Sequence, residues 1–287
     1  MKTVKLNNGI EMPQFGIGMY ALSSDEAEFA VKEALKAGYR LIDTANVYMN
    51  EKAVGRGMKA SGVKREEIFL STKLWPQDYH YEDAKKAIDA TLKRLDTPYI
   101  DLLLLHQQYG PYLEAYKAME EAVKEGKVRS IGLSDFNATR FQDVIDHCEI
   151  KPVLHQIETH PFYQERDLAK LASKTGTYIE SWFPLGGRED KDKILKNPTL
   201  CEIAKAHNKT TAQIVIRWHL QMGYIVIPGT CDKKEILENI NVFDFELTDE
   251  EMKTIEKLDG TGRFFTMSEE EQERWFMSSH IDFEAQK

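Results

Sequence analysis

The chain has few cysteines, no long apolar run and no excess of basic residues. Its three cysteines, Cys148, Cys201 and Cys231, are widely spaced and form no CxxC pair, so neither a disulfide framework nor a zinc site is indicated. The longest aliphatic run, LLLL at 102–105, is far too short to cross a membrane. The N-terminal MKTVKLNNGI lacks the apolar core of a signal peptide. We therefore expect a cytoplasmic protein with no membrane partner.

The charge balance argues against a nucleic-acid partner. The formal net charge is -9, from 38 Lys and Arg against 47 Asp and Glu. Phosphate backbones are bound by clustered Lys and Arg, and the sequence has no basic stripe. A small anionic ligand is still compatible with this charge, because a local cationic pocket does not require a cationic protein. The hydrophobic fraction of 42% supplies a sizeable core.

Short apolar runs alternate with amphipathic helical windows along most of the chain. The strand-like runs are QFGIG, YRLID, IFLSTK, YIDLLLLH, VRSIGLS, VLHQIE, YIESWF and YIVIPG. Several are apolar on consecutive residues, as strands buried on both faces are. One helical window, 25–38, stops at Gly38, a favoured C-terminal residue for a helix. In another, 82–95, an apolar face is formed by Ala84, Ile88, Leu92 and Leu95.

This alternation predicts an α/β protein with a parallel sheet. Eight units in 287 residues fit a closed (β/α)8 TIM barrel, and we expect a single domain over residues 1–287. The alternative is an open doubly wound sheet, which would carry GxGxxG after its first strand. The nearest match, Gly16-Ile17-Gly18, lacks the third glycine. The opening TVKLNNGIEMP reads as a β-hairpin turning at 7–9, a plug for one barrel end.

Four polar residues stand at the ends of three consecutive predicted strands. Asp43 ends the second strand and Tyr48 follows in the next loop, while Lys73 and His106 end the third and fourth. Each alone has an ordinary structural explanation: a helix cap, a packed aromatic, a surface lysine and a core histidine. Together they would meet at the carboxyl rim of the barrel, where barrel enzymes place their chemistry.

Their combination indicates a proton donor. A free tyrosine has a pKa of about 10 and donates protons poorly near neutrality. A nearby ammonium, here Lys73, is expected to lower that pKa, and Asp43 would supply its counter-charge. His106 would hydrogen-bond a carbonyl oxygen and orient it toward the phenol. Tyr48 is then predicted to act as a general acid that protonates an oxygen on which negative charge develops.

Seven stretches, in order, resemble the aldo-keto reductase family along nearly the whole chain. They are LIDTANVYMNE, STKLW, YIDLLLLH, EGKVRSIGLSDFN, HQIETHP, IRWHLQMGYIVIPG and ENINVFDFELTDEEM. The resemblance implies an NAD(P)H-dependent enzyme that reduces an aldehyde or ketone to an alcohol. Hydride would pass from C4 of the nicotinamide to the carbonyl carbon, without a metal. The catalytic tetrad would be Asp43, Tyr48, Lys73 and His106.

The resemblance also implies a cofactor site. Ser134, Asp135 and Gln156 would hold the carboxamide of nicotinamide, with Asp135 standing where the family usually has Asn. Trp182 would stack on the ring, and the following Phe183 replaces a usual Ser. The full set implied is Gly18, Met19, Asp43, Ser134, Asp135, Gln156, Trp182, Pro184, Leu185, Gly186, Thr230, Glu235, Glu238 and Asn239.

The phosphate clamp of the family is altered in IPGTCDKKEILEN. Gly229 stands at the usual Lys position, Thr230 at the Ser position and Glu235 at the Arg position. A glutamate should repel the 2′-phosphate of NADPH, and it can accept hydrogen bonds from a ribose diol as NAD sites do. Lys233 and Lys234 lie beside it, either within reach of the phosphate or as a solvated helix start. The cofactor is therefore NADP(H) or NAD(H), with an expected loss of NADPH discrimination.

The expected substrate is a small-molecule carbonyl compound. By resemblance its pocket is lined by Tyr20, Trp75 and Gln107, the last at a position that is often Trp, so the mouth should be more polar than usual. The C-terminal GRFFTMSEEEQERWFMSSHIDF is expected as an extension near the barrel mouth. Its aromatic residues are predicted either to cover the mouth or to pack on the exterior or on a second subunit: Phe264, Phe265, Trp275 and Phe276. We expect a monomer or weak homo-oligomer.

Two other functions fit parts of the pattern. In an aldolase-like barrel, Lys73 would be the Schiff-base nucleophile. That chemistry gives the neighbouring Tyr-His pair a less clear role. A catalytically retired barrel would bind nucleotide and act as a regulatory or structural subunit. The substitutions at Asp135, Phe183, Gly229 and Glu235 are of the kind such a protein shows, but its tetrad would not need to stay intact.

Overall fold

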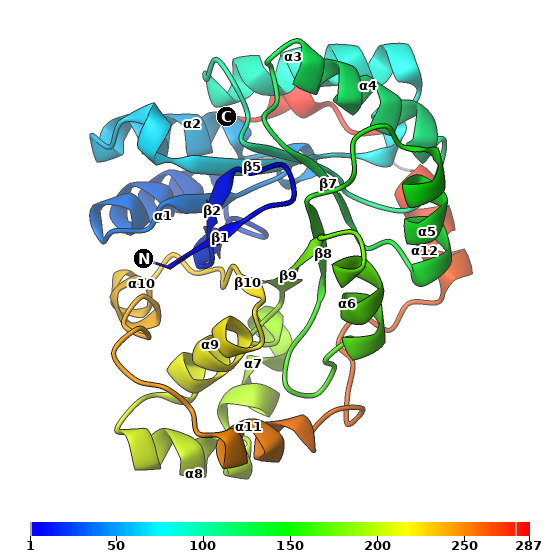
Figure 1. The fold of residues 1–287 in the computed structure, drawn as a ribbon. Helices are drawn as coiled ribbons and strands as arrows, with labels where there is room; N and C mark the ends of the chain where they lie inside the picture. Colours follow the sequence, from blue (N-terminus) through cyan, green and yellow to red (C-terminus); the bar gives the residue numbers. More distant parts are fainter. Residues whose placement is uncertain (1, 279) are drawn as a thin grey trace.

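The computed structural model describes residues 2–278 and 280–287 and has the predicted barrel architecture (Figure 1). Eight parallel strands follow one another in the order β10-β9-β8-β7-β6-β5-β4-β3. A parallel bridge between Phe15, just before β3, and Val226 of β10 joins the two edges and closes the sheet. The strands are β3 (Gly16–Gly18), β4 (Leu41–Asp43), β5 (Phe69–Leu74), β6 (Leu102–Leu105), β7 (Ile131–Ser134), β8 (Leu154–Glu158), β9 (Tyr178–Trp182) and β10 (Ile225–Val226).

Helices surround this sheet on the outside (Figure 1). In α3, Ala84, Ile88 and Leu95 are buried against the barrel and Leu92 packs at their edge, as the apolar face predicts. The first helix begins with a capping box between Ser23 and Glu26. The helices are α1 (Ser24–Lys36), α2 (Glu51–Ser61), α3 (Tyr81–Leu95), α4 (Tyr112–Lys124), α5 (Ala138–His147), α6 (Arg166–Ser173), α7 (Gly187–Leu195), α8 (Pro198–His207), α9 (Thr211–Gln221), α10 (Lys233–Asn239), α11 (Asp249–Glu256) and α12 (Glu269–Ser278).

The N-terminal hairpin closes one end of the barrel. Strands β1 (Thr3–Lys5) and β2 (Glu11–Pro13) pair antiparallel, and Asn7 and Asn8 of their turn hydrogen-bond to residues 152 and 130. Leu6 and Met12 pack beneath the strands in one buried cluster with Leu41, Phe69, Leu102, Leu104, Val153, Leu154, Ile225 and Ile227. Burying a side chain of this size contributes about 1.5–3 kcal/mol. The predicted plug is confirmed, and the opposite end is the one open to a ligand.

The C-terminal segment crosses that open end. After α11 the chain runs along the rim to α12, which lies beside α5 (Figure 1), where Glu269 accepts a hydrogen bond from Asn137. The last residues return to α2 and α3, where Glu284 pairs with Arg94. The predicted extension near the barrel mouth is therefore present.

Candidate active site

The carboxyl ends of β4 and β5 place a buried ion pair at the open end of the barrel. Lys73 Nζ donates to Asp43 Oδ1 at 2.5 Å and to the carbonyl oxygen of Thr44 at 2.9 Å. The side chains of Lys73 and Asp43 are 0% and 3% exposed, so water does not compete for these bonds. Both contacts of Lys73 run to oxygen acceptors, and one of these is the carboxylate of Asp43.

Tyr48 and His106 lie directly around this pair. Tyr48 ends a 3-10 helix, η1 (Asn46–Tyr48), and Lys73 Nζ is 5.0 Å from the centre of its ring. The His106 ring centre lies 5.5 Å from that of Tyr48, and Trp75 packs edge-on to His106 at 5.1 Å. The structure thus brings together all four residues of the expected tetrad, and Trp75 with them.

The protonation states of the phenol and the imidazole are set mainly by burial. Burial raises the pKa of Tyr48 well above 10, and the negative charges of Asp43 and Asp135 raise it further. The expectation that Lys73 brings this pKa below its usual value is wrong, because burial of the phenol is the largest effect and the nearby carboxylates add to it. Burial, and then Lys73, hold the pKa of His106 well below 6.5, so its imidazole is neutral. Tyr48 therefore keeps its proton until a stronger base, such as an alkoxide, forms beside it.

A second buried carboxyl group lies next to the ion pair. Gln156 Nε2 on β8 donates to Asp43 Oδ2 at 3.1 Å and to Glu180 Oε2 on β9 at 2.9 Å. Burial, and then the charge of Asp43, raise the pKa of Glu180 to about 8. Glu180 is not among the residues expected from the sequence, although an acid inside the otherwise apolar run YIESWF is a usable signal.

Asp135 is engaged with other side chains. It adopts a left-handed conformation (φ 57°) at the end of β7 and accepts hydrogen bonds from Trp182 Nε1 at 2.8 Å and Gln107 Nε2 at 3.2 Å. Burial raises its pKa to about 7, despite the hydrogen bond from Trp182. Its neighbour Ser134 has a buried hydroxyl with no partner in the described part of the chain. Among the expected carboxamide-binding residues, Ser134 therefore has a buried polar atom that is free for a ligand.

The loop after β9 is shaped by Phe183. This residue also has a positive φ of 50°, and its ring contacts Trp182 at 4.8 Å and Tyr20 at 5.9 Å, between ring centres. Tyr20 is 56% exposed and lies against Tyr48 at 5.2 Å. Pro184 and Leu185 follow, and Gly186, with φ 87°, is the N-cap of α7. This expected pyrophosphate loop thus borders the same opening as the tetrad.

The altered phosphate clamp lies where β10 meets β3. Thr230 Oγ1 donates to Glu235 Oε2 at 2.6 Å, while Lys233 Nζ is turned to Glu33 on α1 at 2.7 Å. A Cβ added to Gly229 would lie 2.9 Å from the carbonyl oxygen of Gly18, so the two loops touch through their backbones. Nearby, Glu238 accepts a hydrogen bond from Thr210, Asn239 at the end of α10 is buried, and Met19 is buried after β3.

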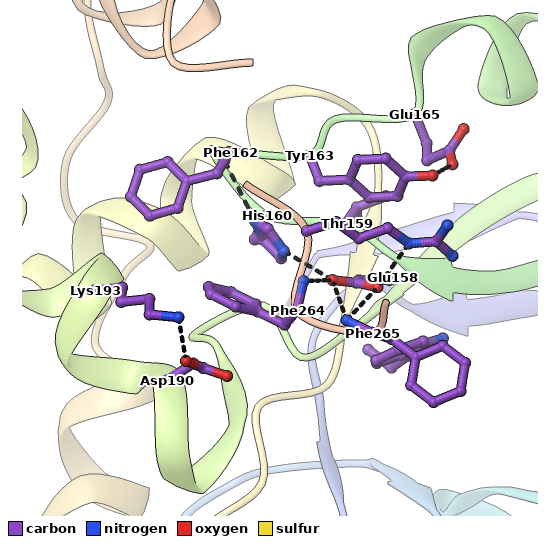
Figure 2. Close-up of polar contacts among 12 residues, drawn as sticks. Glu158, Thr159, His160, Phe162, Tyr163, Glu165, Asp190, Lys193, Phe264 and Phe265 are labelled. Atoms are coloured by element: carbon purple, nitrogen blue, oxygen red, sulfur yellow. Dashed lines mark hydrogen bonds and ion pairs between the residues drawn. The ribbon is translucent and has the colours of Figure 1, made fainter. Parts of the chain in front are cut away.

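Two of the four C-terminal aromatic residues, Phe265 and Phe276, lie at the barrel mouth. Phe276 packs on Trp75 at 5.3 Å, and Phe265 lies 6.2 Å from Trp182 and 6.5 Å from Phe276. Phe264 packs at 4.3 Å on His160 after β8, with the two rings tilted (Figure 2), and also contacts the apolar cluster formed by α7, α8 and α9. Trp275 is 55% exposed on the outer face of α12. The mouth-covering alternative thus describes Phe265 and Phe276, and the exterior alternative describes Phe264.

The described residues include neither a metal-binding cluster nor a membrane-spanning helix. No group of three or more His, Cys, Asp or Glu side chains in residues 2–278 and 280–287 is arranged to hold a metal ion. Over the same residues, no helix has the length and apolar character needed to span a membrane.

Comparison with known proteins gives consistent matches. The model of the Aldo/keto reductase family matches residues 12–260. The chain is 42% identical to a glyoxal reductase of Bacillus subtilis, over 89% of this chain and 92% of that protein. The structure of an aldo-keto reductase from a Medee basin deep-sea metagenome library is 41% identical with a TM-score of 0.90, covering 92% and 97%. The aldo-keto reductase of Bombyx mori in complex with NADP is 33% identical with a TM-score of 0.87, covering 93% and 95%.

Proposed function

We propose that Tyr48 is the proton donor of this enzyme. The chain belongs to the aldo/keto reductase family, and it is a nicotinamide-dependent oxidoreductase that reduces aldehydes or ketones. The carrying observation is the buried Lys73–Asp43 pair beneath the Tyr48 ring, with a neutral His106 on its other side. No observation favours the Schiff-base or retired-barrel alternatives.

Each member of the tetrad has a separate task in this proposal. The bound reduced cofactor supplies the hydride that adds to the carbonyl carbon. His106 hydrogen-bonds the carbonyl oxygen and holds it near the phenol. Tyr48 donates its proton to that oxygen as negative charge develops, and Lys73 stabilises the phenolate that is left. Asp43 holds Lys73 in place through the 2.5 Å contact.

The residues around the tetrad fit a nicotinamide nucleotide. The buried, unpartnered hydroxyl of Ser134 suits a ligand that carries an amide. Trp182, half-buried at the rim and hydrogen-bonded to Asp135, offers a ring face for stacking. The backbone turn at 184–186, which leads into α7, suits a pyrophosphate.

We further propose that the enzyme has lost the usual discrimination in favour of NADPH. Glu235 is placed by Thr230 in the region of the altered clamp, and Lys233, one of the two lysines that precede it, is paired with Glu33. A carboxylate there repels a phosphate and accepts from a diol. Comparing kcat/KM for NADH and NADPH tests this, together with Glu235→Arg. The variant should move the ratio toward NADPH by about tenfold, and a strong NADPH preference in the wild type would refute the proposal.

The substrate is proposed to be a small, polar carbonyl compound. Gln107 and Asp135 give the mouth polar groups beside its aromatic walls, and a relative is named as a glyoxal reductase. We also retain three predictions: a single domain over residues 1–287, a cytoplasmic location, and a monomer or weak homo-oligomer.

The test follows absorbance of the reduced cofactor with glyoxal and a panel of larger aldehydes. Tyr48→Phe should lower kcat by about 100-fold or more, while binding of the reduced cofactor, measured by tryptophan fluorescence, stays unchanged. An unaffected rate in Tyr48→Phe would remove the proton-donor role.

A further inference from the structure

A buried carboxylate ties the C-terminal segment to the barrel. Glu158 is the last residue of β8, and its side chain is 1% exposed. It accepts hydrogen bonds from the backbone N–H of Phe264 at 2.7 Å and of Phe265 at 3.3 Å (Figure 2). Arg263 Nε lies 3.3 Å from its Oε2 atom. Three consecutive residues, more than a hundred positions away along the chain, thus converge on one carboxylate.

The remaining partner of Glu158 belongs to the barrel itself. His160 Nε2 lies 3.1 Å from Glu158 Oε1, while His160 Nδ1 accepts the backbone N–H of Phe162 at 3.3 Å. The proton of the imidazole therefore sits on Nε2 and points to Glu158. Within the described residues, His160 would be the one partner left to Glu158 if residues 263–265 moved away. A buried carboxylate so poorly satisfied is costly, so Glu158 holds these residues down.

These three residues carry part of the wall of the catalytic opening. Phe265 lies 6.2 Å from Trp182 and stacks at 6.5 Å on Phe276, which in turn packs on Trp75. The match to the family model stops at residue 260, just before this segment. The contacts of residues 263–265 with Glu158 therefore go beyond what the family match describes.

We propose that Glu158 is a positioning residue that locks residues 263–265 across the barrel mouth, so that Phe265 forms a fixed wall for the larger carbonyl substrates. This inference rests on the proposed function and concerns which substrates the same site accepts. A small carbonyl compound held between Tyr48 and His106 has little apolar surface to place against Phe265. A larger one packs its apolar part there, so it depends on the lock.

The first experiment reads the lock without any catalysis. Glu158→Gln keeps the shape of the side chain but replaces one acceptor oxygen by an NH2 group. This NH2 group would point at N–H donors of residues 263–265 and could not accept hydrogen bonds from them. Hydrogen exchange at the amides of Phe264 and Phe265 should become at least about tenfold faster. Glu256→Gln, a substitution on an exposed pair with Arg166, is the matched control and should leave both amides protected. Unchanged exchange in Glu158→Gln overturns the proposal.

The second experiment measures the effect on substrate selection. In Glu158→Gln, KM should rise about tenfold for an aromatic aldehyde large enough to touch Phe265, with kcat and the KM for glyoxal unchanged. Phe265→Ala should reproduce this kinetic change while its Phe264 amide stays protected, and it serves if Glu158→Gln does not fold.

The outcomes separate the lock from the proposed function. Equal losses for both aldehydes together with a lower Tm would mean that Glu158 has only a structural role, which refutes the proposal. A wild type that oxidises no reduced cofactor with any carbonyl would refute the proposed function. The exchange of the Phe264 and Phe265 amides would still report on the lock in that case.

Discussion

Replacing Asp43 by asparagine is expected to destabilise the barrel strongly, because it leaves the Lys73 ammonium buried without a counter-charge. The two side chains meet at 2.5 Å and are almost completely excluded from water. In Asp43→Asn the amide oxygen can still accept a hydrogen bond, but it carries no charge. The carbonyl oxygen of Thr44, at 2.9 Å, is then the other acceptor.

The magnitude follows from the geometry of the pair. At an Nζ–Oδ1 separation of 2.5 Å, the attraction is about 7 kcal/mol at an effective dielectric constant of about 20. Desolvation of the two ions cancels much of this, so the intact pair adds little net stability. When one partner is lost, the desolvation of the other is no longer offset. We therefore expect a loss of about 3–5 kcal/mol for Asp43→Asn, and recovery of most of it in the double variant Asp43→Asn/Lys73→Met.

Urea unfolding followed by tryptophan fluorescence measures both variants. The control is Glu121→Gln, which removes a half-exposed pair with Lys85 and should cost less than about 1 kcal/mol. A loss below about 1 kcal/mol for Asp43→Asn, with an unchanged denaturant slope, would show that the pair is not desolvated. The assignment of Lys73 as a held ammonium would then fail.

Two further predictions concern pH. The pKa of Glu180 is raised in the folded state from 4.5 to about 8, so its contribution to stability is complete below the unfolded pKa and is lost as the pH rises through about 8. Between about pH 5 and 8, the free energy of unfolding of the wild type should therefore fall with rising pH by about 1.4 kcal/mol per pH unit more than that of Glu180→Gln. Equal pH slopes of the two proteins in unfolding titrations would contradict this. The pKa of Asp135 is raised to about 7, and only the ionised carboxylate accepts freely from both Trp182 and Gln107. The kcat/KM of the wild type should therefore change with a midpoint near 7 that is absent in Asp135→Asn; a midpoint that persists in the variant would assign it to another group.

The barrel and the tetrad could be predicted because both follow from local patterns. Strands buried on both faces are apolar on consecutive residues, and Lys73 and His106 stand at the ends of two such runs. Parallel strands in a barrel must end at the same rim, so the meeting of these residues with Asp43 is a consequence of topology. The N-terminal hairpin could be predicted for the same reason, because its turn residues lie next to its two strands in the sequence.

Contacts between distant elements were not accessible in the same way. The bond from Trp182 to Asp135 depends on a left-handed backbone at Asp135, which the sequence does not announce. The convergence of residues 263–265 on Glu158 depends on the path of a segment without regular structure. The error over the pKa of Tyr48 has a related cause, since this pKa depends on how deeply the phenol is buried and on which carboxylates lie around it.

The backbone contact between Gly18 and Gly229 restricts how the cofactor preference of this enzyme can be redesigned or can evolve. A lysine at 229 would bring its Cβ within 2.9 Å of the Gly18 carbonyl oxygen, at the seam where the barrel closes. Restoring that lysine alone would therefore strain the scaffold before it reached a phosphate. Glu235 lies exposed on α10 and carries no such restriction. The accessible mutational path toward a phosphorylated cofactor begins there, on the helix and away from the seam.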